Sequence, residues 1–259
     1  TEYFFKVAAV DTAGYEGTPS KEISVVAAFL GPTWWVSENG EDKNDGSEFS
    51  PFASLGAALS NVHTGDTIIV KSGTYTGNNN SGFRDYEIFH DDMQDPNEFN
   101  QDQSMELLIK GETGNPNDVI FDGQDNNVQR FFEFQRGDPF KDKITFQGIT
   151  FQNEYHNGDN QDGGRSGGGA ITISGETELI FDRIIFRNNV ASQSDFHAGG
   201  GAVFISVRRG SISPKFIECG FINNRVSNKD DNDGSNAFGG AVSIEPGWDG
   251  FNGSPSDES

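Results

Sequence analysis

Charged and imidazole side chains gather in three polar segments in the second half of the chain. These segments read EYHNGDNQDGGRS after Asn153, NVASQSDFHA after Asn188 and NRVSNKDDNDGSNA after Asn223. Such groups bind sugar hydroxyls or, through carboxylate oxygens, a hard cation. Because each segment follows the same asparagine of a repeat, we expect all three to emerge at one corner and form one polar surface. The alternative is that they are solvated loops without a ligand. The candidate ligand-binding residues are His156, Asp159, Asp162, Arg165, Asp195, His197 and Asp231.

Calcium is the one metal ion that the acidic segments leave open as a cofactor. DKNDG ending at Gly46 and DDNDG ending at Gly234 resemble calcium loops at first sight. Each has a lysine, Lys43 or Lys229, where an EF-hand loop needs an oxygen ligand, so neither matches. His63 and His90 lie outside the repeat, and the four histidines show no zinc-binding spacing. The sequence therefore identifies no metal ligands, and any Ca²⁺ would occupy an irregular site.

Two enzymatic chemistries stay open as alternatives to simple binding. A polysaccharide lyase needs a basic residue to remove a proton beside a carboxylate, and the nearest candidates are Arg165, Arg208 and Arg209. A glycoside hydrolase needs two carboxylates about 5 to 9 Å apart, which acidic segments on adjacent coils could supply. No cluster in the sequence identifies catalytic residues for either reaction.

The net charge argues against nucleic acid and membrane surfaces as partners. With 40 acidic and 18 basic residues the formal charge is -22, which repels phosphate backbones and anionic lipid. No apolar run reaches the roughly 20 residues that a membrane-spanning helix needs. The single cysteine, Cys219, has no partner in the chain for a disulfide, and its position in the repeat predicts a core residue.

A repeat of 35 residues is the strongest structural signal. ITFQGITFQN from Ile144, LIFDRIIFRN from Leu179 and PKFIECGFIN from Pro214 align without gaps. A fixed period indicates stacked structural units, so equivalent aromatic rings should stack and equivalent asparagines should hydrogen-bond between units. The aligned columns are Phe146, Phe181 and Phe216; Ile149, Ile184 and Cys219; Phe151, Phe186 and Phe221; and Asn153, Asn188 and Asn223.

A second element, led by glycines, lies between these segments. It reads GGGAITIS from Gly167, GGGAVFIS from Gly199 and FGGAVSIE from Phe238, with large aliphatic residues at alternate positions, which predicts half-buried strands. The glycines predict a sharp corner or a close backbone approach. With two-residue turns at Gln147–Gly148 and Asp182–Arg183, each unit supplies about three short strands, as in one coil of a parallel β-helix.

The first hundred residues contain other elements. TEYFFKVAAVDTAGYEGTPSKEISV alternates apolar and polar residues around a turn and predicts a β-hairpin, followed by a boundary near residue 30. Ser50 and Pro51 are the expected N-cap and first residue of a short helix whose apolar face ends at Val62. Trp34–Trp35 looks like a sugar platform, but strand packing is the preferred interpretation. Residues 78–104 are acidic and predict a long loop.

Three resemblances support this division of the chain. The hairpin resembles the last two strands of fibronectin type III domains. The block from Trp35 to Tyr75 resembles the N-terminal cap and first coil of pectin-lyase-like β-helix proteins, and the GGA-[IV] and FxxN motifs resemble the repeats of polymorphic outer membrane proteins. They imply an all-β protein: residues 1–28 as the end of a fibronectin type III-like domain, and residues 29–259 as a right-handed parallel β-helix, truncated at its C-terminus, with about 35-residue coils and a short N-terminal capping helix.

These patterns together predict an extracellular or cell-surface protein, with its signal and anchor outside this sequence. The expected function is non-catalytic: an adhesin-like or carbohydrate-binding protein that contacts a polysaccharide or surface glycan through the loop face of its coils. The first alternative is a polysaccharide lyase or glycoside hydrolase of the pectin-lyase-like fold. The second is a structural spacer that holds other modules apart.

Overall fold

The computed structural model divides the chain into two units, Thr1–Gly31 and Pro32–Ser259. It describes residues 2–26, 32–85, 105–124, 130–134, 142–158, 165–175, 177–193, 197–207, 214–228 and 237–246. In the first unit β1 (Glu2–Phe5) pairs antiparallel with β2 (Ile23–Val26), which confirms the predicted hairpin. Its likeness to a fibronectin type III domain stays a prediction. No helix in these described ranges is long and apolar enough to cross a membrane.

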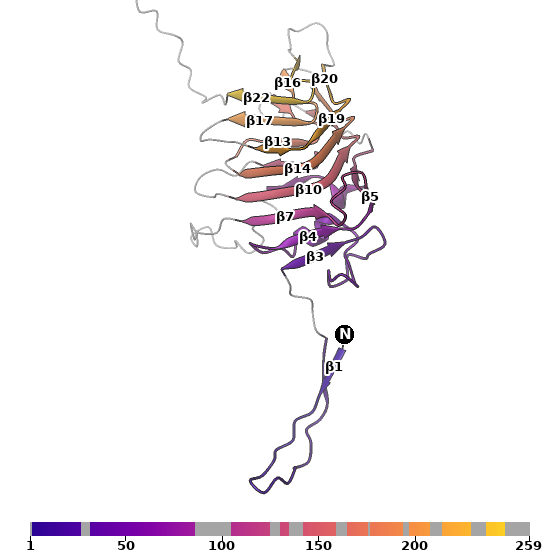
Figure 1. Cartoon of the computed structure of the whole chain (residues 1–259), viewed down its shortest axis with the longest axis vertical. Coiled ribbons are helices and arrows are strands. Elements are labelled where there is room, and N and C mark those ends of the chain that lie inside the picture. Colours follow the sequence, from indigo (N-terminus) through magenta and orange to yellow (C-terminus); the bar gives the residue numbers. More distant parts are fainter. Residues whose placement is uncertain are drawn as a thin grey trace, which may run out of the picture. The chain divides into compact units, whose positions relative to one another are not determined.

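The second unit is a parallel β-solenoid with coils of about 35 residues and almost no helix, as predicted. Its strands stack into three parallel ladders, and Figure 1 shows β3, β4, β7, β10 and β14 one above another. The first ladder contains β3 (Thr33–Val36), β4 (Thr67–Val70), β7 (Glu106–Gly111), β10 (Lys143–Gln152), β14 (Glu178–Arg187) and β18 (Lys215–Ile217). The second contains β5 (Gly73–Tyr75), β8 (Val119–Asp122), the second halves of β10 and β14, and β19 (Gly220–Ile222). The third contains β6 (Phe83–Arg84), β9 (Phe132–Phe134), β13 (Ile171–Ile173), β17 (Val203–Val207) and β22 (Val242–Pro246).

The strand register confirms the 35-residue repeat. In the β10–β14 pair Phe146 lies opposite Phe181, and in the β14–β18 pair Phe181 lies opposite Phe216. The ring centroids are 5.6 Å apart in the first pair and 5.0 Å in the second, with nearly parallel planes. Side chains 35 positions apart therefore lie directly above one another in the core.

A second aromatic stack is longer than the sequence repeat predicts. Besides the predicted phenylalanines of β10, β14 and β19, it includes two aromatic residues from earlier coils. Successive ring centroids lie 5.2, 5.7, 5.8 and 5.2 Å apart. Offset aromatic contacts at such distances add about 0.5 to 1.5 kcal/mol each beyond the burial of their area. The members of this stack are Tyr75, Phe121, Phe151, Phe186 and Phe221.

The predicted asparagine column marks a corner of the coil. Asn153, Asn188 and Asn223 all have a positive φ, between 53° and 56°, a region that asparagine tolerates better than most residues. The Asn188 amide donates to Asn153 Oδ1 at 3.1 Å, which confirms a bond between coils at this pair. Backbone conformation is thus the first reason for asparagine in this column.

The stronger amide ladder lies one residue further on and was not predicted. Asn189 is fully buried, donates its amide to the carbonyl oxygen of Phe151 at 3.0 Å, and accepts from the Glu154 N–H at 3.1 Å. Asn224 repeats the pattern one coil later, with Phe186 as its acceptor at 2.9 Å. The first of these coils reads FQNE and has Glu154 where the next two coils have Asn189 and Asn224. The sequence alone therefore does not show this inner column as a regular repeat.

Replacement of Asn189 by alanine tests this inner ladder. We expect the free energy of unfolding to fall by about 2 to 3 kcal/mol, because the change leaves buried backbone groups without partners. Urea unfolding followed by circular dichroism measures the loss. Asn188→Gly is the matched control: it keeps the positive φ and removes one exposed bond, so it should cost less than about 1 kcal/mol. Equal losses in the two variants would contradict the prediction.

The capping helix is shorter than predicted and begins later. Helix α1 spans Leu55–Leu59 and its N-cap is Ser54, whose hydroxyl accepts from the Ala57 N–H. Ser50 and Pro51 are not its first residues, because the chain is still extended here: Phe52 N donates to Trp35 O at 2.9 Å. The apolar face of α1 is buried as predicted. Within the predicted loop 78–104, residues 78–80 form a 3-10 turn and 83–84 form β6, while 86–104 lie outside the described residues.

Candidate functional site: the stacked arms

Between the second and third ladders the chain leaves the coil as one strand and returns as another. We call each such pair, with its tip, an arm. The outgoing strands are β11 (Tyr155–Gly158), β15 (Val190–Gln193) and β20 (Arg225–Asn228), and the returning strands are β12 (Arg165–Gly167), β16 (His197–Gly199) and β21 (Ala237–Phe238). Each set forms a three-stranded parallel sheet, and Figure 1 labels β16 and β20 at one end of the solenoid. The three polar segments thus emerge at one corner, as predicted, but they begin and end as strands.

Paired glycines form the neck of each arm, where the outgoing and returning strands meet. The first of each pair, Gly168, Gly200 or Gly239, has a φ between 58° and 74°. In the first two arms the second glycine allows a close backbone approach: a Cβ on Gly201 would lie 2.5 Å from both N and O of Arg225. A Cβ on Gly169 would lie 2.8 Å from Val190 N, whereas a Cβ on Gly240 of the third arm would come no closer than 3.8 Å to another residue. The predicted corner is therefore confirmed in all three arms and the close approach in the first two.

The arms place three of the seven predicted ligand-binding residues within the described structure. Arg165 on β12 lies opposite His197 on β16, so two adjacent coils present their polar residues at the same position. His156 on β11 lies opposite Ala191 on β15. The remaining four are outside the described residues, as are the lyase candidates Arg208 and Arg209. These four are Asp159, Asp162, Asp195 and Asp231.

His156 is buried inside its arm and does not lie on the polar surface. Only 8% of the residue is exposed, and neither ring nitrogen has a hydrogen-bond partner among the described residues. Burial, together with the positive charge of Arg130, lowers the pKa of this imidazole to about 3. The sequence holds one signal of this: the register partners of His156 in the next two coils are Ala191 and Val226, an apolar column.

Arg130 is a buried charged residue that the sequence did not single out. Its Nε donates to the carbonyl oxygens of Gly167 and Gly168, both at 3.0 Å. Its Nη1 lies 3.4 Å from Glu133 Oε1, and Arg84 binds the other oxygen of that carboxylate at 3.3 Å. Arg130 thereby ties the neck of the first arm to the third ladder. It has no equivalent in the repeat, so periodicity gave no reason to choose it.

The arms cover the outward face of the third ladder near their necks. Thr172 on β13 donates its hydroxyl to Gly167 O at 2.5 Å, and the ring of Phe204 on β17 fills the space that a Cβ on Gly167 would need. Both side chains are buried. The prediction that these strands are half-buried is therefore wrong for β13 and β17, because the returning strands lie over them.

The acidic loop near the N-terminal cap has a structural role. Asp42 Oδ1 accepts from the N–H groups of Ala53 and Ser54, just before α1. Asp45 Oδ1 accepts from Ser47 N–H, and these hydrogen bonds lower the pKa of Asp45. Across the described ranges, no three His, Cys, Asp or Glu side chains lie close enough together to hold a metal ion. The DDNDG segment lies outside those ranges.

The remaining candidates pack as structural residues. Trp34 is buried against Phe52 and donates its indole N–H to Asp66 at 2.8 Å, in agreement with strand packing. The Lys71 ammonium lies over the Trp35 ring, 5.2 Å from the ring centroid, in a cation–π contact. Cys219 is half-buried, its thiol donates to Phe181 O at 3.3 Å, and burial raises the pKa of that thiol.

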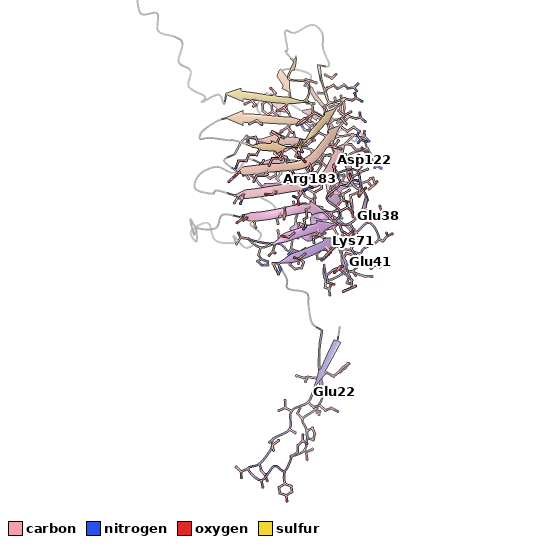
Figure 2. The ribbon with its side chains drawn as sticks, viewed as in Figure 1. Glu22, Glu38, Glu41, Lys71, Asp122 and Arg183 are labelled. Carbon is pink, nitrogen blue, oxygen red and sulfur yellow. The ribbon has the colours of Figure 1, made fainter. Side chains whose placement is uncertain are left out.

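Charged side chains on the coil body are engaged with their neighbours. Lys143 binds Glu106 and Lys215 binds Glu178, each at 2.8 Å, and these pairs raise the pKa of Lys143 and lower that of Glu178. Figure 2 labels Asp122 among the side chains of the coils, and its carboxylate accepts from the Gln152 and Asn153 amides. Such contacts join successive coils and make the body of the solenoid a structural surface.

Comparison of the chain with protein-family models, with curated proteins and with solved structures finds no match. The fold and the arms therefore carry the functional argument.

Proposed function

We propose that this chain is an extracellular or cell-surface solenoid module that binds glycans through the arms and performs no catalysis. The observation that carries the proposal is the parallel register of the arms, in which Arg165 of one coil lies opposite His197 of the next. Neighbouring strands of a sheet are about 4.8 Å apart, so similar polar groups recur along the stack. A repetitive ligand such as a polysaccharide would contact several arms at once and gain avidity from them.

Electrostatics favour a neutral glycan over a uronate polymer. The net charge of -22 repels polyanions at low salt, and four of the carboxylates behind that charge are candidate residues of the arm segments. Carboxylates accept hydrogen bonds from sugar hydroxyls, so acidic tips suit neutral sugars. The proposed ligand class is therefore neutral polysaccharide or surface glycan, with Ca²⁺ as a possible bridging ion.

Among the described residues, the two largest pKa shifts support binding over catalysis. A general acid or base needs a shifted pKa at a place that substrate can reach. Burial raises the pKa of Tyr75 and lowers that of His156, and a substrate cannot reach either side chain because both are buried. The spacer alternative is favoured by a different observation, the long aromatic stacks that make the coil body rigid. Both functions can belong to one module.

A glycan array probed with the labelled chain, with and without Ca²⁺, tests the proposal. We expect binding to neutral polysaccharides, weakened at least tenfold in the double variant Asp195→Asn and Asp231→Asn. The matched control is Glu106→Gln with Glu178→Gln, which removes the same charge from exposed positions on the coil body and should leave binding within about twofold. No binding to any glycan would favour the spacer. Unsaturated or reducing products from any polysaccharide would favour the enzyme.

A further inference from the structure

The first arm contains a buried, titratable group at the edge of its sheet. In the order β11-β15-β20, β11 is the outer strand, and among the described strands it pairs only with β15. His156 on this strand is buried with both ring nitrogens unpartnered in the described structure. Buried polar groups without partners are uncommon and weaken the element that carries them. An outer strand of the arm sheet thus carries a buried imidazole without a hydrogen-bond partner.

The charges around His156 oppose its protonation. Arg130, from the segment before β9, is the charged residue whose field acts on the imidazole, and its guanidinium is fixed by the Gly167 and Gly168 carbonyls. Glu133 faces Arg130 at 3.4 Å. On the adjacent outgoing strand, β15 (Val190–Gln193) contains no ionisable side chain.

Three further ionisable residues lie on the described segments of this arm and the next. Glu154 begins this arm and is buried, with its carboxylate against Gly123. The returning strands carry Arg165 and His197, whose side chains lie outside the description. Among the described residues, the lowered pKa of His156 has burial as its first cause and Arg130 as its second.

We propose that His156 makes the first arm acid-labile: protonation of its ring releases β11 from the solenoid while the aromatic core stays folded. An imidazolium in this position would lie unpaired in a water-poor interior near a second cation, and opening of the arm returns it to water. The later arms have Ala191 and Val226 at the equivalent positions, so they carry no imidazole there. Release of β11 at low pH does not depend on glycan binding by the arms.

The direction of the effect follows from the two protonation states. In the closed arm the pKa of His156 is about 3, whereas in an opened arm it returns to its ordinary value of about 6.5. As the pH falls, the open form is therefore protonated at a higher pH than the closed form. Above about pH 6.5 both forms are neutral at His156, and the closed form has its full stability. As the pH falls from about 6.5 toward 3, the closing equilibrium constant drops about tenfold per pH unit.

Amide hydrogen exchange of the intact chain, resolved by peptide mass spectrometry, tests the proposal. Between about pH 7.5 and 4.5 we expect protection of residues 155–158 to fall about a hundredfold after correction for intrinsic exchange rates. In His156→Leu, compared with the wild type at each pH, this fall should be absent. His63→Leu is the matched control, because the His63 side chain is 82% exposed, and it should behave as the wild type. Peptides from β10 and β14 should show no such dependence in any of the three proteins.

Equal pH dependence in the wild type and His156→Leu would overturn the proposal. If His156→Leu does not fold, the wild type still decides the question through the imidazole carbon shifts in its NMR spectrum. A neutral His156 ring at about pH 5, together with β11 protection that falls as the pH drops below about 6.5, supports the proposal. A charged His156 ring at about pH 5 within a protected β11 refutes it.

Discussion

Replacement of Gly201 by alanine is expected to lower the free energy of unfolding by about 3 kcal/mol or more. A Cβ at this position would lie 2.5 Å from both N and O of Arg225 and would also collide with the Gly240 carbonyl oxygen. All three atoms are backbone, so no side-chain rotation can relieve the overlap, and overpacking against a rigid neighbour is costly. The φ of Gly201 is not positive, so steric overlap at the neck is the cause. Urea unfolding monitored by circular dichroism measures the loss.

The matched control for this change is Gly220→Ala on β19. A Cβ at Gly220 would meet only Ile185 Cγ1 at 3.6 Å, an ordinary van der Waals contact. We expect the free energy of unfolding to change by less than about 0.5 kcal/mol, the usual range for substitutions that disturb no special feature. If the two alanine variants lost equal stability, the close approach at the neck would not explain why glycine occupies position 201.

The sequence predicts the coil body well where the repeat is regular. The same residue recurs at equal spacing in Phe146, Phe181 and Phe216. When successive coils stack in parallel, this spacing places each phenylalanine directly above the next. The αL asparagines and the neck glycines follow the same reasoning, because a conformation that few residues adopt recurs in each coil.

Periodicity failed where coils differ in length. Tyr75 and Phe121 belong to the same aromatic stack as Phe151, but they precede it at spacings of 46 and then 30 residues, so no fixed period connects them. The helix start was misplaced for a related reason. Ser50 and Pro51 are good local signals for a helix, but pairing of Phe52 with the first strand keeps this segment extended.

Polarity was a poor guide to the candidate site. The arm segments are rich in Asp, Asn and Gly and so resemble solvated loops, yet their ends are strands that pair between coils. Polar residues of these strands, among them His156 and Ser192, are therefore buried. Arg130 lies more than 20 residues earlier in the chain, and only the solenoid topology brings it to the neck of the arm.

Replacement of Phe151 by alanine is expected to cost about 3 to 5 kcal/mol, because it opens a cavity where two aromatic stacks meet. The Phe151 ring lies between Phe121 at 5.7 Å and Phe186 at 5.8 Å, and it also contacts Phe146 edge-on at 5.8 Å. A cavity in the middle of a stack removes contacts from both neighbouring coils, so relaxation of one coil cannot close it.

Urea unfolding measures the loss, and Phe49→Ala is the matched control. The Phe49 side chain is 95% exposed at the tip of a turn, so the same change of residue should alter stability by less than about 0.5 kcal/mol. A loss below about 1.5 kcal/mol for Phe151→Ala would show that the coils are held together by their backbone ladders and outer amide contacts, and that the aromatic core contributes little.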